Sequence, residues 1–456
     1  AQATGQQALA IECAVHAAEI LAQGQRDAEA LARSEACLAD AGTPPALRAQ
    51  ALRVQSQVLS RLGRTDEARL ATEAALAAGG LSPLQQGDLE HALSYTHFLR
   101  GDPKASLHHA RQAHALWQAA GARQQAAQAQ ASIGRALDML DEREPAWAAL
   151  EAAHAQAASL RMIDLQRVVA NNLANNRLHH GGPARAIEVI RAAQALAPHF
   201  TRPSQPVFYL GILAQAHAQL GELGTALDLA DEALQRALDM GVTLSIADCL
   251  LMTLELRTRL ADHDGAQRLL DAMAGRSLAG LDYFGVKVAM VYAGHALLTR
   301  QPAAARSHLA RMGDIHQLGM PPDRAEARLR MAQLAWAEGD VTGALEQLAT
   351  LDGQALYTEM QARSCALRLA CHTRLGQVNM AAVQLADDAL ACGAPERVLP
   401  ALDRLELLRA RRDAAMLSGD TPLASQLDAD ATSTQQRLAD RLGRHGHLAH
   451  ALAVRP

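Results

Sequence analysis

Four asparagines stand within six residues of this chain, in the segment Asn171-Asn172-Leu173-Ala174-Asn175-Asn176. The asparagine amide both donates and accepts hydrogen bonds, but asparagine is a mediocre helix former, and this segment lies in a helical pattern. A purely structural helix would keep better helix formers, so the cluster needs another explanation. Residues three apart share a helix face, which places Asn172 beside Asn175. Either these amides bind a ligand, or they bond neighbouring helices or face solvent.

Other reactive side chains do not combine into a catalytic pattern. Asp387-Asp388 and His179-His180 are adjacent in the sequence, and adjacent residues point about 100° apart on a helix of about 3.6 residues per turn. The chain has no HExxH, GxxxxGK or GxSxG motif and no cysteine pair at metal-binding spacing. We therefore expect no catalytic residues, no metal site and no cofactor.

Composition limits the classes of protein and partner. The formal net charge of −5 gives no general attraction to nucleic acid or to anionic membranes, and no apolar run is long enough to span a membrane. Six cysteines at irregular spacing are typical of packed small residues in a reducing compartment. These features predict a cytoplasmic protein with free thiols. Because the chain begins with Ala1, a removed targeting segment or a longer parent protein stays open.

A small residue recurs along the whole chain at intervals of 38 to 42 residues. We call these residues the repeat markers: Ala30, Ala68, Ser106, Ala146, Ala186, Ala226, Ala266, Ala305, Ala344, Ala382 and Ala424. A period near 40 indicates a stack of one supersecondary unit in which each repeat contacts only its neighbours.

Each repeat is predicted to contain two helices joined by a tight reversal. Glycine stands five positions before the marker in six repeats, as at Gly101 and Gly221, and glycine adopts positive φ at little cost. Seven positions after the marker a second small residue, such as Ala113 or Ala153, lies on the same helix face and allows close packing. The pattern predicts an all-α, right-handed solenoid of about eleven repeats.

A proline-rich segment, Pro198 to Pro206, lies near the middle of the chain. As a hinge it would separate an N-terminal half of the solenoid, residues 1–200, from a C-terminal half, residues 201–456, that ends in a capping helix and a short tail. The alternative is an ordinary long loop between repeats.

The repeat resembles the tetratricopeptide repeat. A large and a small residue precede the reversal by about eight positions, and alanine follows it by five, as in Leu173-Ala174 before Gly181 and Ala186. The period exceeds the usual 34 residues. It is similar to the long repeats of maltose-activator-like regulators and of regions preceding diguanylate cyclase (GGDEF) domains. HEAT-like repeats also have periods near 40, but glycine and alanine at the reversal favour the tetratricopeptide class.

This resemblance implies a concave groove lined by the first helix of each repeat. The segment from Asn172 to Asn175 is similar to the Asn-Leu-Gly-Asn pattern of tetratricopeptide repeats that hold extended peptides by the backbone. Tyr95 would add an apolar pocket, and Arg330 and Arg368 could bind a ligand carboxylate. The same register implies these further groove residues: Arg135, Gln215, Glu255, Arg330, Gln333 and Arg368.

The resulting hypothesis is a non-enzymatic scaffold that binds a protein or peptide segment, as the sensory or docking region of a bacterial signalling protein. Homo-oligomer formation stays open, and direct nucleic-acid binding is not expected. The alternative is a small-molecule-sensing regulatory domain of a larger diguanylate cyclase or transcriptional activator whose output domain is absent from this chain. An α-helical toroid lyase would need a closed barrel with convergent acids, and an open repeat argues against closure.

Overall fold

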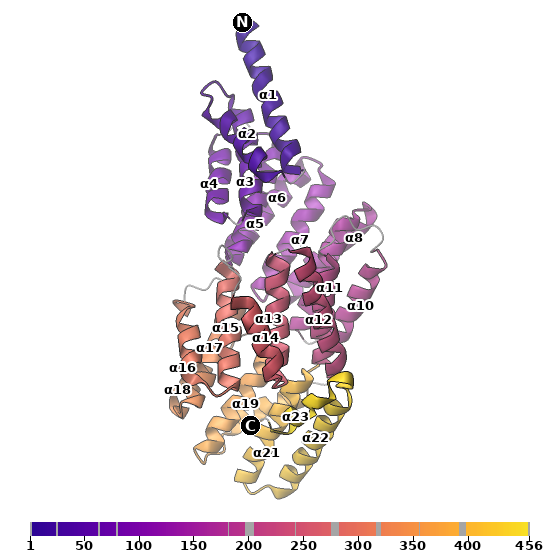
Figure 1. The fold of residues 1–456 in the computed structure, drawn as a ribbon, viewed down its shortest axis with the longest axis vertical. Coiled ribbons are helices and arrows are strands. Elements are labelled where there is room, and N and C mark those ends of the chain that lie inside the picture. Colours follow the sequence, from indigo (N-terminus) through magenta and orange to yellow (C-terminus); the bar gives the residue numbers. More distant parts are fainter. Residues whose placement is uncertain are drawn as a thin grey trace. The chain divides into compact units, whose positions relative to one another are not determined.

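The computed structural model of the chain describes residues 2–23, 26–62, 64–78, 81–180, 182–196, 205–241, 243–274, 282–315, 321–354, 356–391 and 398–454. Regular structure in these ranges is entirely helical (Figure 1). It forms eleven successive pairs, each with a first and a second helix: α1 (Gln2–Gln23) and α2 (Asp27–Ala39), α3 (Pro45–Arg61) and α4 (Thr65–Ala78), α5 (Pro83–Leu99) and α6 (Pro103–Ala119), α7 (Arg123–Met139) and α8 (Arg143–Ser159), α9 (Ile163–His179) and α10 (Pro183–Gln194), α11 (Gln205–Gln219) and α12 (Leu223–Met240), α13 (Thr243–Arg259) and α14 (His263–Ala274), α15 (Asp282–Leu298) and α16 (Pro302–Ala310), α17 (Pro321–Ala337) and α18 (Val341–Ala349), α19 (Thr358–Arg374) and α20 (Met380–Ala391), α21 (Ala401–Leu417) and α22 (Thr421–Asp440). The 3-10 helix η3 (Gly443–Leu448) and α23 (Ala449–Val454) follow the last pair.

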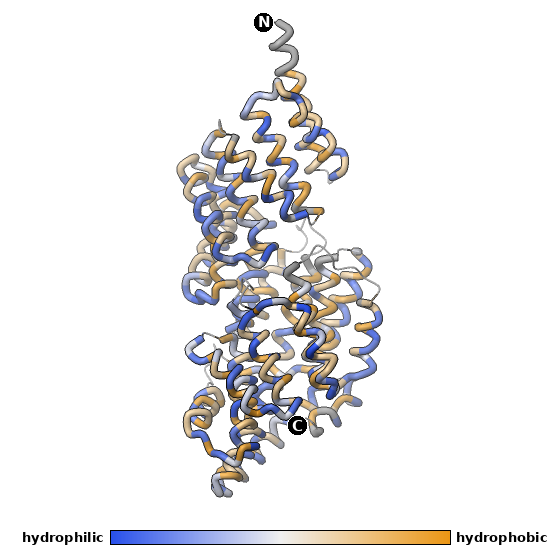
Figure 2. Tube along the Cα trace, turned by 90° about the vertical axis from the view of Figure 1, so that its left-hand side faces the viewer, coloured by the Kyte–Doolittle hydropathy of each residue, from blue (hydrophilic) through white to orange (hydrophobic). Residues whose placement is uncertain are grey.

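The repeat markers lie one on each second helix, which confirms the predicted pairing. All eleven are buried, and the most exposed, Ala424, has only 3% of its surface accessible. Small buried residues at this position let the second helix approach its partner closely, so that a core poor in aromatic residues still packs. Figure 2 shows hydrophilic and hydrophobic residues alternating along the helices, as expected for helices buried on one side.

The reversals and helix starts follow local rules. Asp102, Asp340 and Asp420 cap second helices by accepting a hydrogen bond from the backbone amide three residues further on. In seven repeats the residue five positions before the marker has positive φ, even where it is not glycine, and in the repeat of Ala382 positive φ falls one residue earlier, at Gly376. The turn residues with positive φ are Gly101, Asp141, Gly221, Ala261, Arg300, Gly339 and Gly419.

The chain divides into two compact units. The first unit comprises residues 1–162 with 279–283, and the second unit comprises residues 163–278 with 284–456. Helices α1 to α8 therefore belong to the first unit, and α9 to α23 belong to the second apart from the first two residues of α15. The predicted boundary between residues 200 and 201 lies outside the described residues and stays a prediction.

Repeats of the second unit do not contact only their neighbours, and that expectation is wrong here. The Gly224 amide of α12 donates to the Arg441 carbonyl beyond α22, at 2.9 Å, and Figure 1 shows the C-terminal helices beside α12. A Cβ at position 224 would lie 2.5 Å from the Leu442 carbonyl oxygen, so only glycine permits this approach. Leu227 of α12 shares an apolar cluster with Leu405 of α21. The second unit is thus closed by contacts between the sixth and the eleventh repeats of the chain.

Candidate ligand-binding face

All eight predicted groove residues lie on first helices of their repeats. The list comprises Arg135 on α7, Asn172 and Asn175 on α9, Gln215 on α11, Glu255 on α13, Arg330 and Gln333 on α17, and Arg368 on α19. They separate into two groups by their partners. Within the described part of the chain, the predicted residues on α7, α9 and α11 make no side-chain hydrogen bond or ion pair, whereas those on α13, α17 and α19 bond to other side chains or to the backbone.

The two asparagines of α9 are partly exposed, and the packing residues between them, Leu173 and Ala174, are buried. Neither Asn172 nor Asn175 hydrogen-bonds to a side chain or backbone group within the described part of the chain. The neighbouring Asn171 has an enclosed amide oxygen that accepts no hydrogen bond from the described residues. Helix α9 therefore presents two accessible amides with their bonding capacity unused.

Arg135 of α7 lies against aromatic rings of the preceding first helix, α5. Its guanidinium carbon is 3.9 Å from the centroid of the Phe98 ring and 5.8 Å from that of Tyr95. Both distances are in the range of cation–π contacts. Burial lowers the pKa of Arg135 to about 10, and the nearby Tyr95 opposes that shift. In the described ranges no carboxylate lies within ion-pairing distance of this guanidinium.

A neutral histidine completes the surroundings of Arg135. His91 of α5 lies 3.1 Å from the Ser132 hydroxyl of α7, measured from Nε2 to Oγ. Burial, together with the smaller effect of the positive charge of Arg135, lowers the pKa of His91 to about 4. The other face of the His91 ring meets Trp117, with 5.2 Å between ring centroids. At neutral pH Arg135 is thus the single cation of the cluster that it forms with Tyr95, Phe98 and His91.

The first helices of the second unit carry a network of paired charges instead. The Arg363 guanidinium donates from Nε to Asp403 Oδ1 at 3.0 Å, and Arg259 donates to the same oxygen at 2.6 Å. Arg363 also lies 3.5 Å from Glu255, which is 3.7 Å from Arg330. Asp403 is 1% exposed and Arg363 9% exposed, so these charges are withdrawn from bulk water.

Pairing controls the ionisation of this network. Burial raises the pKa of Asp403, but the Arg259 and Arg363 guanidiniums more than offset that effect and hold it below its usual range. The pKa of Glu255 is lowered in the same way by Arg363 and Arg330. Glu359 differs, because burial and the neighbouring carboxylates raise its pKa more than Arg363 lowers it. We define the charge network as Arg259, Arg330, Arg363, Glu255, Glu326, Glu359 and Asp403.

The remaining predicted residues have mixed surroundings. Arg368 donates to the Leu348 carbonyl at 2.9 Å and to the Asp352 carboxylate at 2.7 Å, so its fork already has acceptors. Gln333 accepts from Arg330 at 3.3 Å. Gln215 of α11 is exposed. The predicted pairing of Arg330 and Arg368 with one ligand carboxylate stays a prediction that would require their present partners to be replaced.

Sequence reasoning missed Phe98, Arg259, Arg363 and Asp403. A signal for some of these contacts was present, because residues about one repeat period apart meet on adjacent first helices. Arg363 and Asp403 are 40 residues apart. In such a chain, opposite charges, or a cation and an aromatic ring, at this separation therefore identify candidate neighbours.

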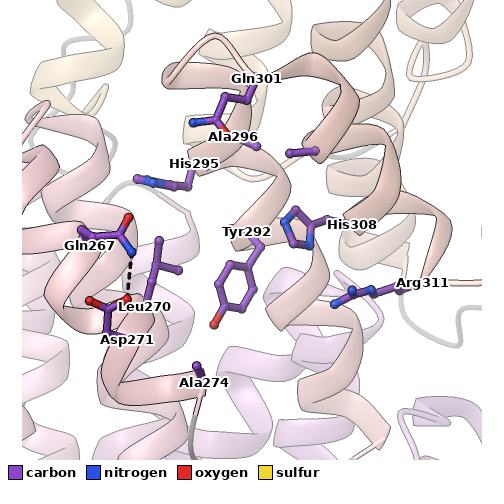
Figure 3. A pocket seen from close by; sticks show the side chains of 11 residues that line it. Gln267, Leu270, Asp271, Ala274, Tyr292, His295, Ala296, Gln301, His308 and Arg311 are labelled. Atoms are coloured by element: carbon purple, nitrogen blue, oxygen red, sulfur yellow. Dashed lines mark hydrogen bonds between the residues drawn. The ribbon is translucent and has the colours of Figure 1, made fainter.

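A pocket of about 450 Å³ lies between α14, α15 and α16 of the second unit. Figure 3 shows Tyr292 beside His308, whose ring centroids are 5.2 Å apart, and Gln267 donating to Asp271 at 2.9 Å. Arg311 and His295 contribute further polar groups to the wall. The pocket therefore has aromatic and polar walls of the kind that contact small organic molecules.

The described residues contain neither a cluster of metal ligands nor a membrane-spanning helix. Over the described residues no group of three His, Cys, Asp or Glu side chains is arranged to hold a metal ion. The same ranges contain no helix with the length and hydropathy needed to cross a membrane. The cysteines that the structure describes are free thiols, and Cys392 lies outside those ranges: Cys13, Cys37, Cys249, Cys365 and Cys371.

No protein-family model and no curated protein sequence matches this chain. Among solved structures the chain is similar to the crystal structure of Rap protein complexed with competence and sporulation factor, with a TM-score of 0.51 at 10% sequence identity. The alignment covers 95% of this chain and 99% of the Rap chain. At this identity the likeness establishes the fold alone. The fold is an all-α solenoid of tetratricopeptide-like helix pairs.

Proposed function

We propose that this chain is a non-catalytic scaffold that binds an extended protein or peptide segment on the first helices of its repeats. The observation that carries the proposal is the pair of accessible amides of Asn172 and Asn175 on α9, which have no hydrogen-bond partner among the described residues. Two amides on one helix face can donate to and accept from a peptide backbone whatever the peptide's side chains are. The context we propose is the sensory or docking region of a bacterial signalling protein in the cytoplasm.

Support for this proposal comes from the fold and from the helix itself. The similar Rap structure was solved with a bound factor, and solenoids of helix pairs present extended concave binding surfaces. Leu173 and Ala174 provide the packing of α9, so the asparagines are not needed for its core. Their low helix propensity therefore favours a functional over a structural explanation.

The test replaces both asparagines with alanine. Peptides that bind the wild-type chain are first selected from a displayed random library, and their affinity for Asn172→Ala/Asn175→Ala is then measured by calorimetry. Loss of up to two hydrogen bonds, each worth about 0.5–1.5 kcal/mol, predicts an affinity about fivefold to a hundredfold weaker. The melting temperature should stay level or rise slightly, since alanine is the better helix former.

A matched control removes two exposed amides from second helices. Gln235 and Gln384 each bond only to an aspartate one turn along their own helix, so Gln235→Ala/Gln384→Ala should leave peptide affinity unchanged. A clear fall in melting temperature with unchanged affinity in the asparagine variant would show that Asn172 and Asn175 hold helices together. The proposed function would then lose its main support.

The pocket between α14, α15 and α16 favours one second candidate, a small-molecule-sensing regulatory domain of a larger protein. Its volume of about 450 Å³ is in the range of small-ligand sites. The test is a thermal-shift screen of metabolites, repeated on Tyr292→Ala, which removes the ring stacked on His308. A metabolite that stabilises the wild type but not this variant supports the candidate, and a screen without such a compound contradicts it.

A further inference from the structure

Arg135 is a desolvated cation without a counter-charge in the described part of its unit. The groups that act on its ionisation are burial and the neutral Tyr95 hydroxyl, and no carboxylate contributes. Its Nε atom is enclosed and has no hydrogen-bond partner among the described residues. Enclosing a guanidinium N–H group without a hydrogen-bond partner is unfavourable, and proteins seldom keep such a group without use.

The aromatic rings cover the flat face of this guanidinium but satisfy none of its N–H groups. Phe98 lies 3.9 Å from the guanidinium carbon, and a cation–π contact of this kind does not replace the hydrogen bonds that the N–H groups would make with water. Nη1 and Nη2 have no acceptor among the described residues, and they are not enclosed as Nε is. The Phe98 ring therefore fixes the orientation of the guanidinium plane, and Nη1 and Nη2 stay accessible to a ligand.

Access from solvent is preserved on this side of the first unit. Tyr95, at the edge of the same cluster, has 40% of its surface accessible, and Arg135 itself is partly exposed. A ligand can therefore reach the outer end of the guanidinium while its apolar part lies against Tyr95 and Phe98.

The single positive charge of the site favours an anion that carries one negative charge. Arg135 is a single positive charge, because the low pKa of His91 keeps that ring neutral at pH 7. A carboxylate carries one negative charge and matches the planar fork with two parallel hydrogen bonds. A phosphate dianion would leave one negative charge uncompensated in the same desolvated site.

We propose that Arg135, held against Phe98 and Tyr95, is a carboxylate-binding subsite of the first unit. The subsite rests on the proposed function in that it would receive an acidic side chain or the C-terminal carboxylate of a bound peptide. It differs from the arginines of the charge network, which already have acids from their own chain.

The experiment uses small probes, so that no selected peptide is required. The melting temperature of the full chain is measured with three capped peptides at constant ionic strength: N-acetyl-Ala-Ala with a free carboxylate, N-acetyl-Ala-Asp-Ala-amide and the neutral N-acetyl-Ala-Ala-amide. Near-saturating carboxylate should raise the melting temperature by about 1–3 °C over the neutral peptide. A shift with the first or the second probe identifies the terminal or the side-chain carboxylate as the source. A shift with neither probe, or an equal shift with chloride or inorganic phosphate, overturns the proposal.

Three arginine variants assign the effect to this residue. Arg135→Met keeps an apolar stem against Phe98 but removes the buried charge, so its melting temperature should stay level or rise while the carboxylate shift disappears. Arg135→Lys keeps the charge without the planar fork and should reduce the shift. Arg368→Met is the matched control, since this first-helix arginine already has acceptors, and it should keep the full shift. If Arg135→Met lowers the melting temperature and retains the shift, the residue is structural and the proposal fails.

The probe experiment is independent of the peptide-binding test. Loss of the carboxylate shift in Arg135→Met can stand even where Asn172→Ala/Asn175→Ala leaves peptide affinity unchanged, and in that case only the peptide scaffold is disproved. Conversely, peptides that bind the wild type and the Arg135→Met variant equally well, without any carboxylate shift, disprove only the subsite.

Discussion

Arg135 of the first unit and the arginines of the charge network in the second unit all stand on first helices, but their surroundings are opposite. In the first unit, Arg135 meets aromatic rings and no acid within the described ranges. In the second unit, Arg259 and Arg363 converge on one buried oxygen of Asp403, and Arg330 lies between Glu255 and Glu326. A first-helix position can therefore carry an arginine without an acid partner among the described residues, as at Arg135, or an arginine that is ion-paired within the chain, as at Arg363.

Closure of the second unit accounts for this difference. Contacts between α12 and the segment after α22 bring α13 and α21 of that unit together, so that Arg259 reaches Asp403 across 144 residues of sequence. A charge brought into such a closed interior must find a partner, because an unpaired buried ion is costly. In Arg135 only Nε is enclosed, and the outer end of the guanidinium stays open to water, so this cation can persist without an acid partner among the described residues. Unused bonding capacity, rather than residue type, distinguishes a binding position from a structural one in this protein.

The largest expected effect comes from breaking the charge network. Arg363→Met should lower the free energy of unfolding by about 3–5 kcal/mol, because it leaves a buried carboxylate, Asp403, with only Arg259 as partner. Arg135→Met should change the same quantity by less than about 1 kcal/mol in either direction, since no acid loses its partner. Urea unfolding followed by circular dichroism measures both.

The network prediction has its own control. Arg363→Lys retains the charge and should recover part of the stability lost in Arg363→Met. Equal losses for the methionine variants at positions 135 and 363 would show that Arg135 has a structural acid partner after all. The contrast between the two units would then disappear.

The next largest effect is the change in the free energy of unfolding at acid pH, which should have opposite signs for His91 of the first unit and Asp323 of the second. The pKa of His91 in the folded state is about 4, below its ordinary value of 6.5. The unfolded chain therefore binds this proton first, and stability falls as the pH drops from about 6.5 to about 4, by about 3 kcal/mol in total. His91→Gln should remove this loss. Unfolding free energies measured between pH 7 and pH 4 give the comparison.

Asp323 of the second unit should behave in the opposite way. Burial raises its pKa to about 6, and Glu326 adds to that shift while Lys287 reduces it. The folded state binds this proton first, so the contribution of Asp323 to stability rises as the pH falls from about 6 to about 4. Asp323→Asn should remove that gain and increase stability at pH 7. Parallel acid profiles for His91→Gln and Asp323→Asn would contradict the assignment of opposite roles.

The smallest expected effect concerns the surface ion pairs that accompany closure. Asp228 of α12 lies 2.6 Å from Arg444 and 2.8 Å from His445, and Asp228 and Arg444 are well exposed. Asp228→Asn should cost less than about 1 kcal/mol at low salt and nothing at high salt. A loss as large as that of Arg363→Met would mean that ion pairs, rather than the apolar cluster around Leu227 and Leu405, close the second unit.

Much of the architecture could be predicted from spacing alone. A marker such as Ala186 must be small wherever two helices approach closely, and a reversal such as Gly221 needs positive φ, so both requirements leave a periodic trace in the sequence. All eleven helix pairs follow from that trace. The first-helix positions of Asn172 and Arg135 follow from the same register, although their ligand-binding roles stay predictions.

Partners of the polar side chains could be predicted only in part. Tyr95 and Arg135, or Arg363 and Asp403, lie one repeat period apart, and the regular stack brings such residues together. By contrast, the bond between Arg259 and Asp403 depends on closure of the second unit. Closure in turn results from the small rotations between successive repeats, added over all the repeats between these two residues. A one-residue change in any intervening loop would alter the accumulated rotation, and this rotation cannot be predicted from the local sequence of any one repeat.

The sequence by itself determined the helices, their pairing and the positions that face away from the core, because these depend on steric demands repeated every 38 to 42 residues. Only the tertiary structure decided which charges on those positions are satisfied. Glu255, for example, lies between Arg330 and Arg363, whereas Arg135 meets the Phe98 ring. The physical reason is that desolvation and pairing depend on everything that surrounds a group, including helices far away in the chain, while helix formation depends on near neighbours.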